Sequence, residues 1–546
     1  MPEYRKKLIE VALPLEAINK ESAREKSIRH GHPSTLHLWW SRKPLATARA
    51  VLFAQMVDDP SSLSDEFPTE EAQETERQRL FHIIGELVKW GNTANEVVLH
   101  AARVEIARSA ARNQGVSLPR NMAPAEVTAA LKQYAPPTLD PFTGGGSIPL
   151  EAQRLGLEAY ASDLNPVAVL INKALIEIPP KFAGCPPVNP ESREKYLTRE
   201  WGGAQGLAED VRYFGEWMRN EARKRIGHLY PKVLLPKEQG GGDATVLAWL
   251  WARTAKCPNP ACSAQMPLTS KWAFSTKKGK ETWVEPVVDR AMKTVRFEVR
   301  YGAGAPEGTV NRLGAKCIVC GSSVPFDHIR EEGRAARMGA QLMAIVAEGK
   351  GGRTYLPPNS EHESIAKSVQ PEMWLDTDLP AEALGFRVQR YGLTQHGQLF
   401  TARQFTALDT FAGLIGVVCA RIEALPGGSV EYANAVSTYL AFALDKAANY
   451  WSSLCSWHQG REILVSTFGL PVLSMVWDFT EANPFSDSSG NWMLGVEQAA
   501  KGLDGAPASG VAYVSQTDAA NCSGEQPHGV VSTDPPYYDN IPYAVM

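Results

Sequence analysis

A carboxylate, two prolines and an aromatic side chain follow one another near the end of the chain, as Asp534, Pro535, Pro536 and Tyr537. The carboxylate and a backbone carbonyl held outward by the rigid prolines can accept both N–H bonds of an exocyclic amine. This favours a more pyramidal nitrogen, whose lone pair can attack a methyl donor in line. Tyr537 can stack on a base extruded from a duplex. The preceding run 529–533 predicts a strand that places the tetrapeptide where open α/β sheets hold their active sites.

A glycine turn at residues 140–147, DPFTGGGS, predicts a second site. A short strand candidate precedes the turn and an amphipathic helix follows it, and Gly144 and Gly146 would let the backbone approach a ligand closely. The spacing is not GxGxxG and no Lys-Ser/Thr follows, which disfavours a dinucleotide or a triphosphate. Asp163 ends the next predicted strand, where a carboxylate can accept hydrogen bonds from ribose hydroxyls. These residues predict a site for a cofactor that carries a ribose but no phosphate.

The elements that must position these residues suggest one α/β domain interrupted by a large insertion. Residues 1–133 form a basic and helical segment, and residues 134–180 form consecutive βα units. Residues 181–508 form a mixed insertion, and residues 509–546 supply the third and fourth strand units. Asp518 follows the third strand and is expected to contact the cofactor, with a solvent-facing aspartate of a turn as the alternative.

Two close cysteine pairs predict a metal site within the insertion, at about residues 253–325. Four thiolates suit a closed, tetrahedral structural zinc site, and the four are Cys257, Cys262, Cys317 and Cys320. Between the pairs, residues 293–301 alternate as a strand, and residues 253–316 hold twelve Lys and Arg against five Asp and Glu. This local charge of +7 contrasts with −4 for the chain. It predicts a ribbon that neutralises phosphates, with a solvated face on a zinc-stapled insertion as the alternative.

Length and composition limit the classes of protein to which this chain can belong. The chain has 546 residues and 44% apolar content, enough for more than one structural unit. No run approaches the ~18 apolar residues of a membrane span, and the start lacks the pattern of a signal peptide. Eight cysteines are too few for a disulfide scaffold of this length. We therefore expect a cytoplasmic protein with no membrane partner.

DPFTGGGS followed by ASDLNPVA resembles the S-adenosylmethionine motifs of class I methyltransferases. The resemblance implies that Asp140, Phe142 and the glycines line the methionine end of the cofactor and that Asp163 holds its ribose. With the opening LIEVALPLEAINKESAREKSIRHGHPSTLHLWWSRKPLATARAVL, the cysteine pairs, VWDFTEANPF and TDPPYYDNIPYA, the chain resembles bacterial and archaeal adenine-specific DNA methylases that contain a zinc ribbon.

That family implies a Rossmann-like sheet and transfer of a methyl group from S-adenosylmethionine to N6 of adenine in DNA, in restriction-modification or phage defence. Cytosine N4 methylation uses the same geometry, and RNA stays open as a substrate. His37, Trp40 and Arg42 are expected either to help close the cofactor pocket or to be structural. Three further tryptophans could face DNA, although a place in the core is favoured: Trp451, Trp457 and Trp477.

A complete class I sheet has further strands beyond the fourth, whereas this sequence ends nine residues after Tyr537. We therefore expect a truncated domain whose fourth strand forms an unpaired edge, and a downstream-encoded polypeptide that completes it. The alternative is a catalytically incompetent fragment that binds nucleic acid or the cofactor.

Overall fold

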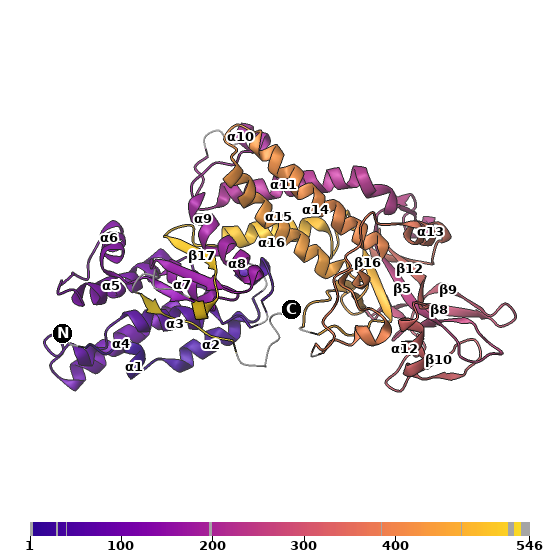
Figure 1. Cartoon of the computed structure of the whole chain (residues 1–546), viewed down its shortest axis with the longest axis horizontal. Helices are drawn as coiled ribbons and strands as arrows, with labels where there is room; N and C mark the ends of the chain where they lie inside the picture. The colour runs from indigo at the N-terminus through magenta and orange to yellow at the C-terminus, as the bar shows by residue number, and fades with distance from the viewer. Residues whose placement is uncertain are drawn as a thin grey trace. The chain divides into compact units, whose positions relative to one another are not determined.

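The computed structural model describes residues 4–28, 31–39, 41–195, 199–383, 385–470, 472–521 and 529–536. The chain divides into two compact units, drawn in Figure 1. Unit 1 comprises the described residues up to Arg212, Ile422–Tyr439, and the described residues from Gln498 on. Unit 2 comprises Tyr213–Arg421 and Leu440–Glu497. The chain therefore passes from unit 1 to unit 2, returns to unit 1 for Ile422–Tyr439, completes unit 2 and ends its described part in unit 1.

Unit 1 begins with a layer of helices whose starts follow local sequence signals. Pro44 precedes the third helix, as its position in the sequence predicts, and the side chains of Thr69 and Asn95 accept hydrogen bonds from backbone amides in the first turns of the fourth and fifth. The helices are α1 (Leu8–Val11), α2 (Leu15–Glu25), α3 (Leu45–Met56), α4 (Glu70–Leu87), α5 (Glu96–Arg112) and α6 (Pro124–Tyr134).

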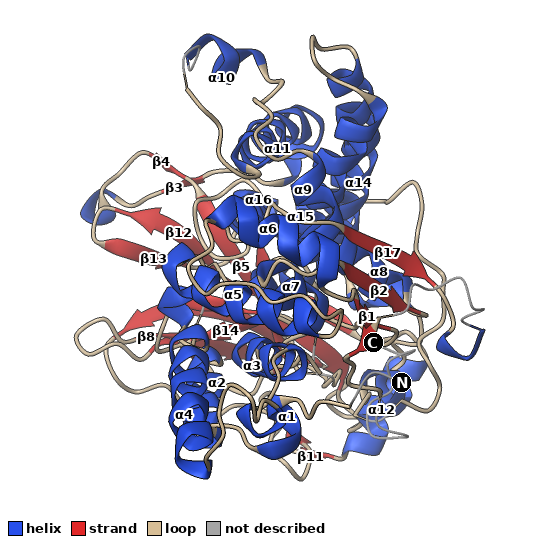
Figure 2. Ribbon diagram, turned by 90° about the vertical axis from the view of Figure 1, so that its left-hand side faces the viewer, coloured by secondary structure: helices blue, strands red, loops and turns tan. Residues whose placement is uncertain are grey.

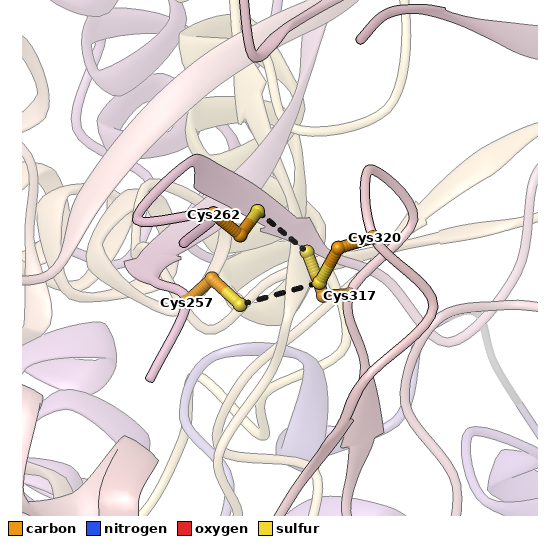
Figure 3. A group of neighbouring side chains, drawn as sticks. All are labelled: Cys257, Cys262, Cys317 and Cys320. Atoms are coloured by element: carbon orange, nitrogen blue, oxygen red, sulfur yellow. Dashed lines mark hydrogen bonds between the residues drawn. The ribbon is translucent and has the colours of Figure 1, made fainter. Parts of the chain in front are cut away.

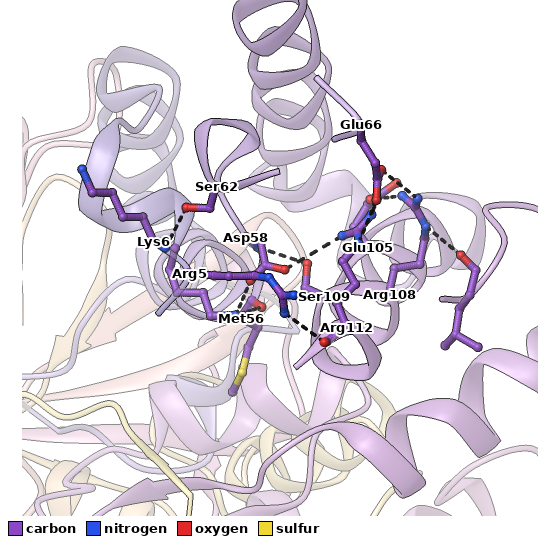
Figure 4. Close-up of polar contacts among 12 residues, drawn as sticks. Arg5, Lys6, Met56, Asp58, Ser62, Glu66, Glu105, Arg108, Ser109 and Arg112 are labelled. Atoms are coloured by element: carbon purple, nitrogen blue, oxygen red, sulfur yellow. Dashed lines mark hydrogen bonds and ion pairs between the residues drawn. The ribbon is translucent and has the colours of Figure 1, made fainter. Parts of the chain in front are cut away.

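A buried polar network fastens the first residues of the chain to α5 (Figure 4). Lys7 Nζ lies 2.6 Å from Asp58 Oδ1, and the Asp58 side chain is fully buried. The backbone N–H of Asp58 donates to Ser109 Oγ at 3.1 Å, and Arg112 pairs with Glu66 at 3.0 Å. Removing one partner of a buried pair costs about 3–5 kcal/mol, because the other charge is left uncompensated. The network therefore holds the opening segment and α5 in one rigid layer.

A four-stranded parallel sheet forms the centre of unit 1, as the sequence predicts. Its strands are β1 (Thr138–Asp140), β2 (Ala159–Asp163), β17 (Ala512–Gln516) and β18 (Val530–Val531), in the order β17-β2-β1-β18. Strands β2 and β17 pair in parallel although all of unit 2 lies between them in the sequence. The fourth strand is shorter than the predicted run 529–533. Figure 2 shows β1, β2 and β17 side by side.

The remaining helices of unit 1 connect these strands or follow them. Helix α7 (Ser147–Arg154) follows β1 and α8 (Pro166–Asn172) follows β2, so both predicted βα units are confirmed. Helices α9 (Ile178–Lys181) and α10 (Pro190–Lys195) come next. Four longer helices have residues in both units: α11 (Gln205–Ile226), α14 (Ala402–Glu423), α15 (Val430–Tyr450) and α16 (Trp492–Asp504).

The two faces of the parallel sheet differ. On one face Ala159, Ala512 and Val530 pack with the helices in a single hydrophobic cluster. On the other face the cross-strand register aligns a row of larger side chains, Tyr513, Tyr160, Leu139 and Val531. The two tyrosine rings stack at 4.9 Å, and 52% of Tyr513 and 58% of Val531 are exposed. This second face is therefore open over part of the row.

Unit 2 is built on an antiparallel sheet whose central strand is β5 (Val246–Lys256). Its partners are β6 (Gln265–Leu268), β12 (Gly339–Gly349), β13 (Gly352–Leu356) and β16 (Asp478–Ala482). A three-stranded sheet contains β7 (Ala273–Ser275), β8 (Thr282–Asp289) and β9 (Thr294–Tyr301). Two-stranded ribbons pair β3 (Val233–Leu234) with β4 (Asp243–Ala244), β10 (Ala315–Lys316) with β11 (Ser323–Val324), and β14 (Ser456–His458) with β15 (Ile463–Val465). Short helices are α12 (Phe326–Arg334) and α13 (Ser360–Ser368).

A buried ion pair lies in the core of unit 2. Arg403 pairs with Glu481, and its guanidinium lies over the ring of Trp249, 4.1 Å from the ring centroid. Trp251 Nε1 donates to the same carboxylate at 3.0 Å, and Trp249 Nε1 donates to His362 Nδ1 at 3.0 Å. The Glu481 carboxylate thus has both a charged and a neutral donor, as a buried charge requires, whereas Arg403 Nε is buried without a hydrogen-bond partner among the described residues.

Within the described ranges, one helix, α14, is long and apolar enough to span a membrane by length and composition. In its most apolar stretch 28% of the residues are buried. The expectation that no segment of the chain is long and apolar enough to span a membrane is therefore wrong for α14. The expected absence of a membrane partner stays a prediction.

Candidate functional site

The glycine turn after β1 has a backbone that only glycine adopts easily. Gly144 and Gly146 have φ of +48° and +78°, and Gly146 caps the start of α7. The buried side chain of Asn172 holds the turn, because its Oδ1 accepts from Thr143 Oγ1 at 2.8 Å and its Nδ2 donates to the Gly144 carbonyl at 3.0 Å. No sequence pattern points to Asn172, which is the last residue of the apolar helix α8 that follows the next strand.

The segment before α3 covers this turn. A Cβ at Gly144 would lie 2.7 Å from Trp39 Nε1, and a Cβ at Gly145 would lie 3.1 Å from Arg42 Cγ. Ser147 Oγ donates to the Lys43 carbonyl at 2.7 Å. In this structure the group that approaches Gly144 closely is thus the side chain of Trp39, whereas the sequence predicted a ligand there. Of the pocket-closing residues predicted from the sequence, Arg42 lies at the turn and Trp40 is outside the described residues.

A buried cluster holds the covering segment in place. Ser34 N–H donates to His32 Nδ1 at 3.1 Å, so His32 Nε2 carries the proton that it donates to Glu25 at 2.8 Å. Burial lowers the pKa of His32, which keeps the ring neutral. The Glu25 carboxylate also accepts from the first amides of α3, at 3.0 Å. Burial lowers the pKa of Arg42 to about 10, and its Nε and Nη1 are buried without a hydrogen-bond partner among the described residues.

The acidic residues predicted for the cofactor lie at the carboxyl ends of three neighbouring strands. Asp163, after β2, accepts from Gly144 N and from Asn165 N, each at 2.9 Å. Asp518, after β17, is exposed and accepts from Ala520 N at 2.9 Å. Asp518 therefore orders its own turn, whereas Asp163 also links its turn to the glycine turn after β1.

Asp140 is the buried acid of this group. It accepts from Thr533 Oγ1 at 2.7 Å and from Phe142 N at 3.2 Å, and it is 3% exposed. Burial raises its pKa to about 6, and the nearby carboxylates of Asp163 and Asp534 act in the same direction. The Thr533 hydrogen bond ties the end of β1 to the end of β18. Phe142, beside it, is 37% exposed.

The Asp-Pro-Pro segment begins three residues after the end of β18. Asp534 pairs with Lys43 Nζ at 2.7 Å, with about a third of each side chain exposed. Pro535 and Pro536 are exposed, and Tyr537 lies outside the described residues. Because β18 is the neighbour of β1, the structure brings Asp534 to the same edge of the sheet as the glycine turn. Lys43, which the sequence did not single out, contributes to both places.

The four predicted metal-ligand cysteines of unit 2 come together (Figure 3). All four sulfur atoms lie within 4.8 Å of one another. Cys257 Sγ is 3.7 Å from Cys320 Sγ, and Cys262 Sγ is 3.9 Å from Cys317 Sγ. Four sulfurs at the Zn–S distance of ~2.3 Å form a tetrahedron with edges of about 3.8 Å. The cluster is therefore compatible with a structural zinc site.

The thiols of the cluster differ in protonation. Burial raises the pKa of Cys257 to about 12 and also raises that of Cys317, whereas hydrogen bonds from Ser322 lower the pKa of Cys320 to about 6. The two buried thiols are therefore neutral on their own, and a bound zinc ion would have to displace their protons. The turn after the second pair has the predicted form, because Gly321 has φ of +78° and donates to the Cys317 carbonyl at 2.7 Å.

The predicted basic ribbon forms, and two of its arginines are paired with glutamates. Strand β9 pairs with β8 along its length, as the alternating pattern predicts. Arg296 pairs with Glu298 at 2.9 Å, and Arg300 pairs with Glu285 at 2.6 Å and with Glu298 at 2.7 Å. The sequence count of charges missed this pairing, which depends on the strand register.

The three tryptophans that were weighed as DNA contacts have different environments. Trp451 is 1% exposed and donates to the Gly490 carbonyl, and Trp477 is 8% exposed, so both belong to the core, as favoured. Trp457 is half-buried and donates to the Phe274 carbonyl at 2.9 Å.

The family model described as "Protein of unknown function (DUF1156)" matches residues 12–83. This stretch contains α2, α3, most of α4 and the segment that covers the glycine turn. The description names no activity, and no methyltransferase family model matches the chain. No curated protein and no solved structure matches it.

Proposed function

We propose that unit 1 is a class I methyltransferase domain that transfers a methyl group from S-adenosylmethionine to N6 of adenine in DNA. The observation that carries the proposal is the strand order. Numbered along the chain, the parallel strands run 3-2-1-4, the beginning of a doubly wound sheet. Such sheets bind ligands beyond the carboxyl ends of the strands where the order reverses, which here is between β1 and β18. The glycine turn and the Asp-Pro-Pro segment follow these two strands.

The chemistry of the turn fits the methionine end of the cofactor. Arg42 lies against Gly145 and has buried Nε and Nη1 atoms that no described residue satisfies. A carboxylate is the anion that a guanidinium pairs with best, and S-adenosylmethionine carries one. Asp163 keeps a second lone pair on each oxygen for ribose hydroxyls. In this proposal Trp39 is the wall of the pocket beside Phe142.

The transfer itself would need orientation of the amine and no strongly shifted base. The bound cofactor supplies an electrophilic methyl group. Asp534 and the Pro535 carbonyl accept the two N–H bonds of the target amine, and Tyr537 stacks on the extruded base. Lys43 Nζ lies within 2.7 Å of Asp534 and holds this carboxylate at the sheet edge until the amine replaces it. The choice of adenine and of DNA rests on the sequence resemblance, and cytosine N4 is the alternative target.

We also propose that zinc fills the cysteine cluster and that a second polypeptide covers the open face of the parallel sheet. Parallel sheets are ordinarily covered by helices on both faces. The aromatic row of Tyr160 and Tyr513 gives such a partner an apolar surface to pack against.

Calorimetric titration of the full chain with S-adenosylmethionine tests the cofactor site. Asp163→Ala is expected to weaken binding at least about tenfold, because about 1.4 kcal/mol of ribose hydrogen bonding is lost. Glu158→Ala, at the opposite end of β2, is the matched control and should bind like the wild type. Absence of binding by the wild-type chain would contradict the proposal, and so would equal loss in both variants. Circular dichroism of each variant reports folding.

A further inference from the structure

Unit 2 has a groove of about 1190 Å³ that belongs neither to the cysteine cluster nor to the proposed catalytic site. Three turns form much of its wall: residues 237–240, residues 277–280 before β8, and residues 349–352 between β12 and β13. Figure 2 shows the β12–β13 pair beside β3 and β4. Each of the three turns carries at least one lysine and at least one glycine.

The turns are tied to one another, so the groove has a fixed shape. Lys280 Nζ donates to the Gly351 carbonyl at 2.8 Å, which links the second turn to the third. The stem of Lys350 packs against Gly240, which links the third turn to the first. Gln239 Nε2 donates to Tyr301 Oη at 2.7 Å, and Tyr301 donates to the Tyr355 carbonyl at 2.9 Å. The first turn is thus also fastened to the end of β9.

The cations of the groove differ from those of the β8–β9 ribbon. Lys237, Lys278 and Lys350 are exposed and form no ion pair within the described part of the chain. On the ribbon, by contrast, Arg296 and Arg300 are held by glutamates. An unpaired ammonium group binds a phosphate at a lower cost in free energy than a paired one, because no protein carboxylate has to be displaced.

The remaining charges of the groove leave it cationic. Arg353 donates to Ser488 Oγ at 3.0 Å, and Lys277 is neutralised by Glu462. Counted by formal charge, the lining holds six Lys and Arg against four acids, which are Glu238, Glu348, Glu462 and Asp487. Gly279 and Gly351 face open space, so a polymer backbone can approach these turns closely.

We propose that this groove binds the phosphate backbone of duplex DNA and thereby holds the substrate of the proposed methyltransferase. The inference rests on the proposed function for the identity of the polymer. The contacts are to phosphates and carry no sequence information by themselves. Lys237, Lys278 and Lys350 are the contacts that the proposal names.

Fluorescence anisotropy of a labelled duplex with the full chain, over a series of salt concentrations, tests the groove. The variant Lys278→Ala/Lys350→Ala removes two groove lysines. Lys224→Ala/Lys367→Ala is the control, because it removes two exposed lysines of unit 2 outside the groove. Each lost phosphate contact lowers the slope of log K against log salt by about 0.9 and weakens binding several-fold at moderate salt.

We expect the groove variant to bind at least about tenfold more weakly, with a slope lower by about 2, while the control keeps wild-type values. Equal binding by the two variants overturns the inference, and so does a wild-type chain that binds no duplex. Binding of single-stranded RNA alone, with the same lysine dependence, overturns the assignment to DNA. S-adenosylmethionine binding, measured separately, shows whether the proposed function fails or only the groove.

Discussion

Replacing the buried Asp140 by Asn should make the parallel sheet more stable, and increasingly so as the pH rises. In the folded protein burial raises the pKa of Asp140 to about 6, against 3.8 for a solvated aspartate. The folded state therefore binds the proton more tightly than the unfolded state, and stability is lost as the pH rises from about 4 to about 6. Above that range the ionised carboxylate lowers the free energy of unfolding by about 3 kcal/mol. Asparagine carries no charge, and its Oδ1 can still accept from Thr533 and Phe142.

The difference in stability between Asp140→Asn and the wild type is expected to reach about 3 kcal/mol at pH 8 and about half of that at pH 5. Hydrogen exchange of peptides that contain β1 and β18, measured at both pH values, reports the opening free energy of this sheet. A variant whose excess stability does not grow between pH 5 and pH 8 would refute the reasoning. A variant less stable than the wild type at pH 8 would do the same.

The remaining predictions concern the metal, the turn and the ion pair. Cys317→Ser should remove the single equivalent of zinc that elemental analysis is expected to find, because a closed site needs all four thiolates. Gly146→Ala should lower stability by about 1–2 kcal/mol more than Gly31→Ala, since both sites have positive φ but only the first crowds a neighbour. Lys43→Met should lower the rate of methyl transfer at least about tenfold with a stability change below about 1 kcal/mol, because its pair with Asp534 is partly exposed.

These predictions have controls. Cys185→Ser removes a half-buried thiol outside the cluster and should leave the zinc content unchanged. Retention of a full equivalent of zinc after the loss of Cys317 would contradict the metal site. Identical melting temperatures for Gly146→Ala and Gly31→Ala would show that a Cβ at position 146 is not crowded by the side chain of Asn172. A stability loss of several kcal/mol in Lys43→Met would assign that residue a structural role.

The local elements of the sheet and the metal cluster could be predicted because their signals are short. The glycine turn and Asp163 could be recognised from the residues next to them in the sequence. The cysteine pairs could be recognised because zinc requires a fixed set of ligands. The third and fourth strand units followed from the order of the motifs, whereas the pairing of β17 with β2 is seen only in the structure. The network of Glu25 and His32, by contrast, depends on side chains meeting across the fold, and no local pattern encodes it.

Counting charges in the sequence does not show which of them are paired, for a related reason. The composition of residues 253–316 predicted a basic ribbon, but the strand register brings Glu285 and Glu298 to Arg300. Cross-strand pairs depend on which residues face one another, and this is set by the turn and the sheet. The cations left without partners lie at turns from distant parts of unit 2, where only the structure shows that they share a groove.

Methyl transfer to DNA tests the central claim most directly. The full chain is incubated with duplex DNA and S-adenosylmethionine labelled in its methyl group, and the nucleosides of the product are identified by mass spectrometry. The account predicts N6-methyladenine with the wild type and none with Asp534→Ala, which should still bind the cofactor. Binding of both substrates without any labelled base, even when the proposed partner that covers the open face of the sheet is added, would contradict it.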